Sequence, residues 1–402
     1  KMKDSGIEWI GEIPEGWELR KGKSLYRVTT GKLDANAENP DGDYPFFTCS
    51  MAPKRINSYS FDCEALLVAG NGLVGFTQYY KGKFDAYQRT YVLSDFRNVL
   101  PSFLRYYVSV GLPMEVQPKS IGSVIQFIKL GDLLNFNITL PSIEQQTIIS
   151  NYLEFKIIQI DAILSKTRSS IEEYKKLKQA VITQAVTKGV RGEREMKDSG
   201  VEWIGEIPVN WTIQRFARVA EVKSNLVSPD NYLEYPQISP ENIEKDSGKL
   251  LLPCRTVAEV GVISGNHLFY KGQILYSKIR PKLNKVCIAP FDGLCSADMY
   301  PIESKNDTRY IMYCILSNGF LQQVSMITEN RVKMPKINQV ELSKVLVAIP
   351  ETIAEQKEIA DYLDAKCAEI DKLIAKKEQL VKELESYKKS LIYEVVTGKR
   401  EV

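Results

Sequence analysis

The stretch MKDSGIEWIGEIP at residues 2–14 returns almost unchanged as MKDSGVEWIGEIP at residues 196–208. Twelve of the 13 positions match, and the two copies start 194 residues apart. All four tryptophans of the chain lie in or just after these copies, at matching places: Trp9, Trp17, Trp203 and Trp211. A period of about 200 residues is far longer than the unit of a solenoid, so the sequence predicts a duplicated pair of domains.

A second pair of related segments closes each half of the chain. LPSIEQQTIISNYLEFKIIQID at residues 140–161 resembles IPETIAEQKEIADYLDAKCAEID at residues 349–371, with an offset of 210 from Ser142 and Thr352 onward. Between the repeated segments lie a first arm, residues 18–140, and a second arm, residues 212–348, which barely resemble each other. We infer that the scaffold was retained while the arms diverged.

Each of these closing segments is expected to begin a long helix. A proline precedes a capping box, Ser142-x-x-Gln145 in one copy and Thr352-x-x-Glu355 in the other, which satisfies free backbone N–H groups of the first turn. Mostly apolar residues then follow at spacings of four and three for about five heptads, which is typical of a coiled coil. The first copy of this series is Leu153, Ile157, Ile160, Leu164, Thr167, Ile171, Tyr174, Lys178, Val181 and Ala185. The second copy is Leu363, Cys367, Ile370, Ile374, Lys377, Val381, Leu384, Lys388, Leu391 and Val395.

Two long helices could each pack on their own domain. Polar breaks at the same steps of both series, 167 with 377 and 178 with 388, instead favour pairing of the helices with each other. A two-fold relation between the copies makes that pairing antiparallel. About 42 helical residues would span roughly 60 Å, and Gly189 and Gly398 stand where left-handed C-caps would end the helices.

Both arms have mixed character. Short β-like runs occur at residues 65–69 and 90–93, and helical stretches at residues 102–110 and 309–323. The predicted fold class is therefore α+β: two mixed α/β globular domains separated by two long antiparallel coiled-coil helices, with pseudo-two-fold symmetry.

Positive charge is concentrated on the arms. The first arm has 14 Lys and Arg against 11 Asp and Glu, and the second has 17 against 13, whereas the whole chain has a net charge of +3. Basic clusters occur in SKIRPKLNK at residues 277–285 and in ENRVKMPK at residues 329–336, and GNGLVGFTQYYKGKF at residues 70–84 interleaves aromatic residues with lysines. Such loops can hold phosphates and read base edges, although ordinary solvated turns have a similar composition.

The composition argues against several other classes of protein. A hydrophobic content of 44% with 26% charged residues is typical of a folded globular protein. No apolar run approaches the roughly 18 residues that a membrane span needs, and no signal-peptide pattern is expected. Seven cysteines without a C-x-x-C pair predict reduced, structural thiols in a cytosol, without a disulfide framework or a zinc site.

The sequence contains no complete motif for catalysis. Gly70-x-Gly72-x-x-Gly75 fits a dinucleotide fingerprint, but a strand is expected after it in place of the phosphate-binding helix. Residues 16–24 miss the P-loop spacing by one position, and His267 is the only histidine, which excludes a multi-histidine metal site. No [DN]-P-P-[YF] motif for adenine methylation is present. We therefore expect no active site and no metal or cofactor in this chain.

With these features the sequence resembles the specificity subunits of type I restriction–modification enzymes, over its whole length. KDSGIEWIGEIPEGW and KDSGVEWIGEIPVNW resemble the segment that opens each target-recognition domain of that family. LPSIEQQ and IPETIAEQ, each followed by a long helix ending in AVTKG or VVTGK, resemble the family's conserved spacer regions. GKFDAYQRTYVL and KIRPKLNKV are similar to strands and loops common in its recognition domains.

The resemblance implies a DNA-binding subunit without catalysis of its own. Each recognition domain would read one half of a bipartite double-stranded DNA target, and the helices would set the spacer between the halves. It implies two methyltransferase subunits that use S-adenosylmethionine, restriction and motor subunits that use ATP and Mg²⁺, no membrane partner, and a role in prokaryotic cytoplasmic phage defence. The expected domains are recognition domain 1 (residues 1–140), a central helical spacer (141–195), recognition domain 2 (196–348) and a C-terminal helical spacer (349–402).

Loop position and side-chain chemistry predict a set of DNA-binding residues in each arm. In the first arm they are Thr48, Asn71, Gln88, Arg89, Lys119, Ser123 and Gln126. In the second arm they are Ser239, Asn242, Lys278, Arg280, Lys282, Asn284, Lys285, Arg331, Lys333 and Lys336. The alternatives are a specificity protein of another multi-subunit methyltransferase, a DNA-modifying enzyme with an unrecognised site, and a coiled-coil adaptor whose arms bind peptides.

Overall fold

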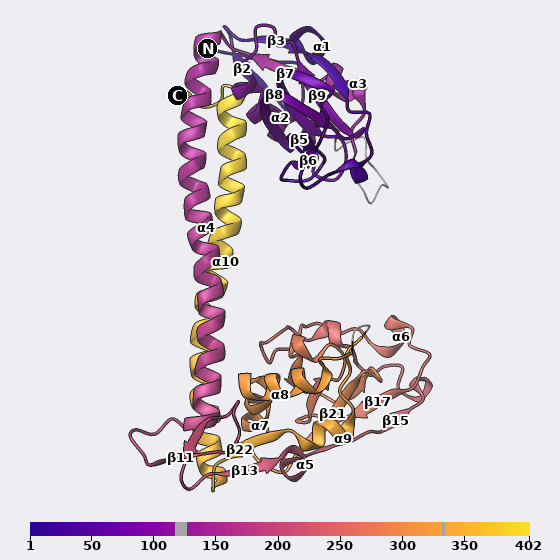
Figure 1. Ribbon diagram of the computed structural model, residues 1–402, viewed down its shortest axis with the longest axis vertical. Helices are drawn as coiled ribbons and strands as arrows, with labels where there is room; N and C mark the ends of the chain where they lie inside the picture. Colours follow the sequence, from indigo (N-terminus) through magenta and orange to yellow (C-terminus); the bar gives the residue numbers. More distant parts are fainter. Residues whose placement is uncertain (117–126, 332–333) are drawn as a thin grey trace. The chain divides into compact units, whose positions relative to one another are not determined.

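The computed structural model describes residues 1–116, 127–331 and 334–402 (Figure 1). It divides into two compact units, the first made of Lys1–Arg168 with Gln379–Val402 and the second of Ser169–Glu378. The two longest helices, α4 (Ile143–Lys188) and α10 (Ile353–Val396), each contribute one half to each unit. Each unit therefore contains one arm and one half of a helix pair, and each is described by itself.

The repeated opening segment forms the same hairpin in both units. Strand β1 (Met2–Asp4) pairs with β2 (Glu12–Pro14), and β11 (Met196–Asp198) pairs with β12 (Glu206–Pro208) in the same antiparallel register. The turn is also the same, because the carboxylate of Asp4 accepts from the Gly6 N–H at 2.9 Å, and Asp198 accepts from Gly200 at 2.9 Å. Both glycines have positive φ, 70° and 72°, which explains why glycine stands there.

The entrance and the exit of each arm pair as a two-stranded ribbon. In the first unit β3 (Glu18–Lys21) runs antiparallel to β10 (Asn137–Leu140). In the second unit β13 (Thr212–Arg215) runs antiparallel to β22 (Leu346–Ile349). A one-turn helix follows each entrance strand, α1 (Gly22–Leu25) and α5 (Phe216–Val219). The arms thus diverge only beyond a shared base.

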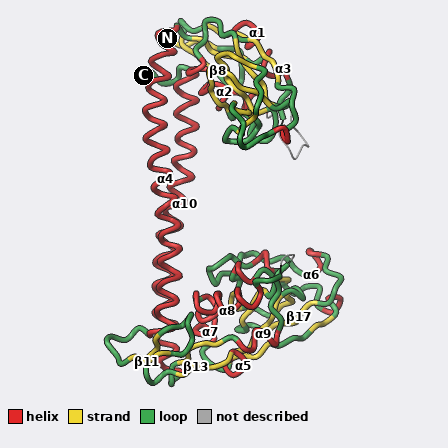
Figure 2. The backbone as a smooth tube through the Cα atoms, viewed as in Figure 1, coloured by secondary structure: helices red, strands yellow, loops and turns green. Residues whose placement is uncertain are grey.

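The first arm is built on one six-stranded sheet, drawn as yellow strands in Figure 2. Its strands, in spatial order, are β4 (Arg27–Thr30), β9 (Thr90–Ser94), β7 (Phe61–Ala69), β8 (Thr77–Ala86), β5 (Tyr44–Phe47) and β6 (Lys54–Ile56). Besides α1, the described residues of this arm form the helices α2 (Pro101–Val116) and α3 (Leu130–Leu134). The predicted strands at 65–69 and 90–93 and the predicted helix at 102–110 are confirmed. Strand β8 follows Gly75, so the glycine-rich segment leads into a strand, as expected.

The second arm has a different architecture, with two four-stranded sheets. One sheet contains β14 (Ala220–Val222), β21 (Met299–Ser304), β18 (Ile274–Ser277) and β19 (Val286–Ile288). The other contains β15 (Leu226–Val227), β17 (Asn266–Phe269), β20 (Gly293–Cys295) and β16 (Gln237–Ile238). Besides α5, the described part of this arm forms the helices α6 (Val257–Val260), α7 (Thr308–Leu316), α8 (Asn318–Thr328) and α9 (Gln339–Lys344).

The prediction of one continuous helix at 309–323 is wrong. Ser317 is extended, with ψ of 153°, and its hydroxyl accepts from the Phe320 N–H at 3.4 Å, so it ends α7 and caps α8. A serine inside an apolar helical pattern offers the backbone such an alternative hydrogen bond.

In the first unit the long helices pair antiparallel. Asp161 binds Lys388 at 2.6 Å and Arg168 binds Glu385, so residue numbers rise along α4 as they fall along α10. Buried residues of both helices share one core with the arm, namely Leu153, Ile160 and Leu164 from α4 and Leu391, Ile392, Val395 and Val396 from α10. Ile157, Val381 and Leu384 are partly buried against this core.

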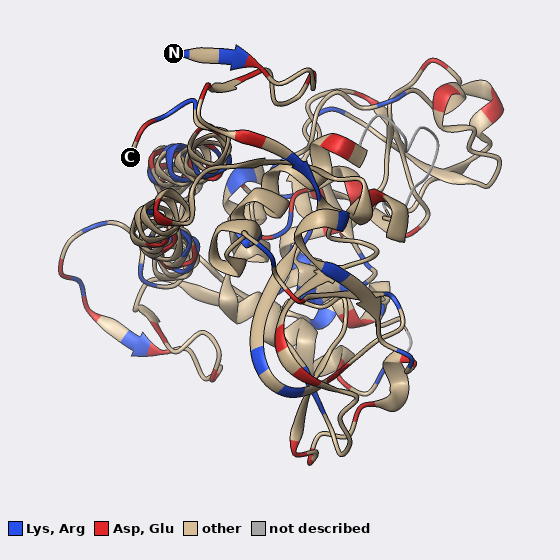
Figure 3. Ribbon diagram, turned by 90° about the horizontal axis from the view of Figure 1, so that it is seen from above, with Lys and Arg blue, Asp and Glu red and all other residues tan. Residues whose placement is uncertain are grey.

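The second unit repeats this arrangement. Lys178 binds Asp371 at 2.9 Å and Arg191 binds Glu358 at 2.7 Å, again with opposite chain directions. Leu363, Cys367 and Ile370 of α10 are buried, as is Ile171 of α4, whereas Ile374 is partly exposed. The antiparallel pairing that the sequence predicted is therefore confirmed in both units. Figure 3 shows the helices end-on, with Lys and Arg in blue and Asp and Glu in red along their ribbons.

At one of the two polar steps, 178 and 388, each lysine forms an ion pair with an aspartate of the other helix. Lys178 with Asp371 and Lys388 with Asp161 are counterparts at the offset of 210. The Lys178 side chain is only 7% exposed and its ammonium binds both carboxylate oxygens, at 2.9 and 3.0 Å. A shifted register would leave this ammonium buried without a carboxylate. The pairs therefore select one register of the helices.

The predicted caps are present, with one difference. Ser142 and Gln145 exchange both hydrogen bonds of a capping box, at 3.3 and 3.4 Å. Thr352 accepts from the Glu355 N–H at 3.2 Å, but the Glu355 carboxylate binds Arg194 at 2.6 Å and the Trp211 indole at 3.2 Å. Gly189 and Gly398 end the helices with φ of 76° and 73°, as predicted.

A buried glutamine ties each arm to its long helix. Gln146, fully buried in the first turn of α4, accepts from the Leu100 N–H at 2.8 Å, at the start of α2. Its counterpart Gln356 accepts from the Asp307 N–H at 3.0 Å, at the start of α7. The same side chain thus makes the same connection in two arms of different architecture. None of the helices in the described parts of the chain is both long and apolar enough to cross a membrane.

Replacing Lys178 by Met is expected to lower the free energy of unfolding by about 1–2 kcal/mol, because the partly buried Asp371 carboxylate keeps only Lys249 as a cation partner. Lys388→Met is the matched control. Its pair is more exposed, 29% for Lys388 and 50% for Asp161, so the loss should stay below about 0.5 kcal/mol. Urea unfolding followed by circular dichroism measures both, and equal losses would show that burial of the pair does not matter.

Candidate nucleic-acid interface

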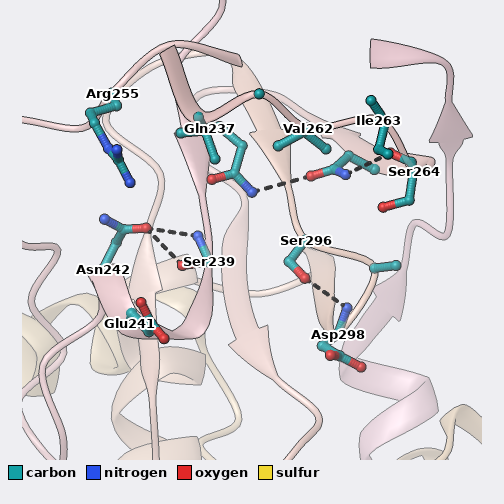
Figure 4. Close-up of a pocket in the computed structure, with 14 residues that line it drawn as sticks. Gln237, Ser239, Glu241, Asn242, Arg255, Val262, Ile263, Ser264, Ser296 and Asp298 are labelled. Carbon is teal, nitrogen blue, oxygen red and sulfur yellow. Dashed lines mark hydrogen bonds between the residues drawn. The ribbon is translucent and has the colours of Figure 1, made fainter. Parts of the chain in front are cut away.

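A polar pocket in the second arm is the first candidate for contact with a ligand (Figure 4). Its volume is about 540 Å³, and it is lined by residues of segments 237–242, 260–266 and 296–298 together with Arg255. Segment 237–242 contains β16, which runs parallel to β20, and Asn266 begins β17 in the same sheet. The sheet therefore brings three distant parts of the sequence to one edge.

Two buried amides form the floor of this pocket. Gln237 is 7% exposed and Asn266 is 3% exposed. The Gln237 amide N–H donates to Asn266 Oδ1 at 3.3 Å, and the Asn266 amide N–H donates to the Ser264 carbonyl at 3.0 Å. No described residue donates to Gln237 Oε1, which leaves an acceptor open to the pocket. Sequence reasoning missed both residues, because buried amides in short strands look like ordinary core polar groups.

The other wall of the pocket holds Ser239 and Asn242, two of the predicted DNA-binding residues. The backbone N–H of Ser239 donates to Asn242 Oδ1 at 2.8 Å, and its hydroxyl lies 3.1 Å from the same oxygen. This fixes the Asn242 amide so that its nitrogen remains without a described partner. Arg255 is exposed at the rim, and its guanidinium also has no described partner. The pocket thus offers fixed donors and acceptors of the kind that read base edges.

The predicted basic loop at 277–285 lies beside the pocket, and its cations differ in role. The Lys285 ammonium donates to the Pro240 carbonyl at 2.7 Å and so braces the pocket wall. Lys278 lies over the Tyr300 ring at 5.2 Å. Arg280 and Lys282 are exposed, and their side chains have no described partner. These two are the cations of the loop that are available to a phosphate.

Asn284 does not lie where the sequence interpretation placed it. Its side chain is 1% exposed and donates to the Leu316 carbonyl at 3.2 Å. Its φ of 44° is left-handed, a conformation that asparagine tolerates better than most residues. Asn284 therefore shapes the loop, and in this conformation it has no surface for DNA.

The second predicted basic loop is adjacent to the first. The Arg280 N–H donates to the Pro335 carbonyl at 2.8 Å, and Ile279 and Lys336 form a β-bridge. Lys336 binds Asp298 of the pocket lining at 3.2 Å, and Arg331 is paired with Glu341. Lys333 lies outside the described residues. The structure thus gathers the pocket and the two basic loops into one surface of the second arm, which we call the second-arm surface.

In the first arm the predicted residues gather at one edge of the six-stranded sheet. Thr48 follows β5, Asn71 follows β7, and Gln88 and Arg89 lie between β8 and β9. The Gly70 N–H donates to the Arg89 carbonyl at 2.9 Å, which brings the last two loops together. Arg89 is exposed without a described side-chain partner, whereas Gln88 donates to Asp34 at 2.6 Å and Thr48 is 8% exposed. Lys119, Ser123 and Gln126 lie outside the described residues.

Burial shifts the pKa of several titratable groups in the second arm. His267 is 2% exposed, and its Nδ1 atom has no hydrogen-bond partner among the described residues. Burial lowers the pKa of His267, and the Lys278 ammonium lowers it further, so the imidazole is neutral at pH 7. The seven cysteines are free thiols in the structure, and burial raises the pKa of Cys287 to about 12. Within the described residues, no group of three or more His, Cys, Asp or Glu side chains is placed to hold a metal ion.

Comparison with known sequences relates both halves of the chain to one family. The family described as "Type I restriction modification DNA specificity domain" matches residues 14–173 and 208–383. The specificity subunit of the Escherichia coli type I restriction enzyme EcoDI is 39% identical over 364 residues, which cover 87% of this chain and 81% of that protein. The MjaVIII specificity subunit of Methanocaldococcus jannaschii is 23% identical over 412 residues, covering 96% of this chain and 93% of that protein.

A solved structure shows the same fold. It belongs to a study of complex assembly and conformational transition of the type I R-M system, and its matching chain superposes with a TM-score of 0.68. The alignment covers 96% of this chain and 99% of that chain, at 14% sequence identity. With one family match in each half and a relative of high identity over most of its length, this chain belongs to the type I restriction–modification specificity subunits, and its two arms are target-recognition domains.

Proposed function

We propose that this chain selects an asymmetric, bipartite double-stranded DNA sequence for a type I restriction–modification complex. The observation that supports this most is a contrast within the chain. The two arms start from the same strand ribbon and the same glutamine contact to the long helix, yet one arm contains a six-stranded sheet and the other two four-stranded sheets. Two identical readers would favour a palindromic target. Two different readers on a repeated scaffold favour a target whose halves differ.

In the second arm, phosphates and bases would meet different parts of the second-arm surface. Arg280, Lys282 and Arg255 are exposed and lack described partners, so they can neutralise phosphates. Hydrogen bonds fix the side-chain amides of Asn242 and Gln237. The Asn242 amide then offers a free donor and the Gln237 amide a free acceptor, so the two side chains can distinguish base edges. In the first arm, Arg89 and Asn71 would have the corresponding roles at the sheet edge.

The chemistry of the complex would belong to partner subunits. Two methyltransferase subunits would bind S-adenosylmethionine and dock on the helix pair, and restriction subunits would use ATP and Mg²⁺. The chain itself would direct adenine methylation or cleavage to the chosen site without catalysing either. The site would be reached in the prokaryotic cytoplasm, where the DNA lies.

The phosphate role predicts a uniform loss of affinity. Arg280→Ala and Lys282→Ala should each weaken binding to all duplexes alike and reduce the slope of log K against log salt by about 1. Lys271→Ala, an exposed lysine of the same arm outside this surface, is the matched control. Fluorescence anisotropy on the duplex identified by methylome sequencing measures both quantities. If the duplex does not bind at all in low salt, the proposed function is wrong.

The base-reading role predicts a local loss of specificity. Asn242→Ala should relax discrimination at one base pair of the second half-site by about 1–3 kcal/mol and leave the first half-site unchanged. The measurement compares single-base-pair variants of the duplex with the wild-type and variant proteins. Equal losses for every duplex would assign Asn242 a structural role.

The helix pair predicts the length of the unread spacer. Removing residues 169–175 from α4 together with 374–380 from α10 deletes one heptad from each helix and retains both lysine–aspartate pairs. The spacer should then shorten by about three base pairs, since seven helical residues span about 10 Å. Methylome sequencing of the variant complex reads the spacer directly. An unchanged spacer would show that the helices do not set it.

A further inference from the structure

A hairpin of the second arm connects the polar pocket with the long helices. At one end of this hairpin, the Leu251 N–H donates to the Asn242 carbonyl at 2.7 Å. Further along, the Glu244 N–H donates to the Lys249 carbonyl at 3.0 Å, and residues 244–249 form the hairpin tip. Asn242 lines the pocket in Figure 4, so the pocket wall and the hairpin tip belong to one continuous piece of backbone.

The hairpin tip is bound to the helix pair of its own unit by polar contacts. The Lys249 ammonium binds the Asp371 carboxylate of α10 at 2.6 Å, and the Gln179 amide of α4 donates to the Asp246 carbonyl at 3.3 Å. The tip sequence EKDSGK contains no apolar residue. Tip and helices also line a cavity of about 760 Å³ between them. The tip therefore offers no apolar side chain to the helices, and these two contacts position it.

The carboxylate that binds the hairpin tip is the one that fixes the helix register. Both oxygens of Asp371 accept from the buried Lys178 ammonium, at 2.9 and 3.0 Å, and one of them also binds Lys249. Asp371 is only 19% exposed, so its position is set by these partners. One side chain thus links the register of the helices to the tip, and through the hairpin to the wall that contains Asn242.

The first arm is attached without such a contact. Asp161, the counterpart of Asp371, is paired with Lys388 and, among the described residues, with no residue of the first arm. Both arms share the strand ribbon at their base and the buried glutamine contact to the long helix. Since these shared contacts hold the first arm, attachment of the second arm does not by itself require the hairpin tip.

We propose that Lys249 and Gln179 are positioning residues for DNA recognition, which hold the Asn242 wall of the pocket at a fixed place on the helix pair. This inference rests on the proposed function. One base pair more or less in the spacer moves a half-site by about 3.4 Å along the duplex and about 35° around it. A wall that is held cannot follow this displacement, whereas a released wall can follow part of it. The hairpin tip thus makes the second arm favour one spacer length.

The test removes both tip contacts with Gln179→Leu and Lys249→Met in the full chain. Fluorescence anisotropy gives the Kd for the duplex with the native spacer and for duplexes with a spacer one base pair longer or shorter. The ratio of altered-spacer Kd to native-spacer Kd should fall by about threefold in the variant, as expected for the loss of one half-exposed ion pair and a hydrogen bond. Discrimination against single-base changes in the half-sites should stay at the wild-type level, because the contacts of Ser239 with Asn242 remain.

Two further variants are the controls. Lys245→Met changes an exposed lysine of the same tip, which is paired with the neighbouring Asp246 at 3.6 Å, and should leave the ratio unchanged. Lys249→Arg keeps a cation for Asp371 and should keep the wild-type ratio.

Three results would overturn the inference. The ratio could stay at the wild-type value in the double variant, or fall equally in Lys245→Met. The double variant could also weaken binding to all three duplexes by the same factor, which would give the two residues a purely structural role. If the wild-type chain does not bind the native duplex at all, the proposed function itself is wrong, a result distinct from these three.

Discussion

The lysine–aspartate pairs between α4 and α10 are the constraint on which the scaffold depends. A long apolar helix surface can pair in several registers, since each heptad offers nearly the same contacts. Lys178 removes that freedom, because its side chain is almost fully buried. Only the observed register places the Asp371 carboxylate where it accepts two hydrogen bonds from the Lys178 ammonium. Lys388 and Asp161 repeat the constraint in the other unit. Polar residues that weaken a coiled coil thus make its geometry specific.

The two arms are attached to the long helices in the same way but differ in their sheet architecture. Gln146 and Gln356 make the same buried contacts to the first helix of each arm, and the entrance and exit strands form the same ribbon. Beyond these contacts nothing requires the sheets to match. A recognition domain can therefore change its sheet, its loops and its chemistry while its orientation on the helix of its own unit is retained.

In the second arm, charge serves both the fold and the surface. Lys285 and Lys336 lie in the loops that the sequence marked as basic, yet they bind Pro240 and Asp298 and so hold the walls of the pocket. Arg280 and Lys282 remain available. Some lysines of a basic cluster thus stabilise the arm itself. Net charge alone does not identify which cations are free to bind a phosphate.

The sequence by itself determined the duplication, the two long helices with their caps and polar steps, and their antiparallel pairing, because these follow from local periodicity and from comparison of one copy with the other. It also identified strands β7 and β9 and the strand after Gly75, whose signals are local. Only the tertiary structure decided that α7 ends at Ser317, that Asn284 is buried, and that Gln237, Asn266 and Arg255 share a pocket with Ser239 and Asn242. These outcomes depend on contacts between residues far apart in the chain, where burial and hydrogen-bond partners are set by the sheet that brings them together.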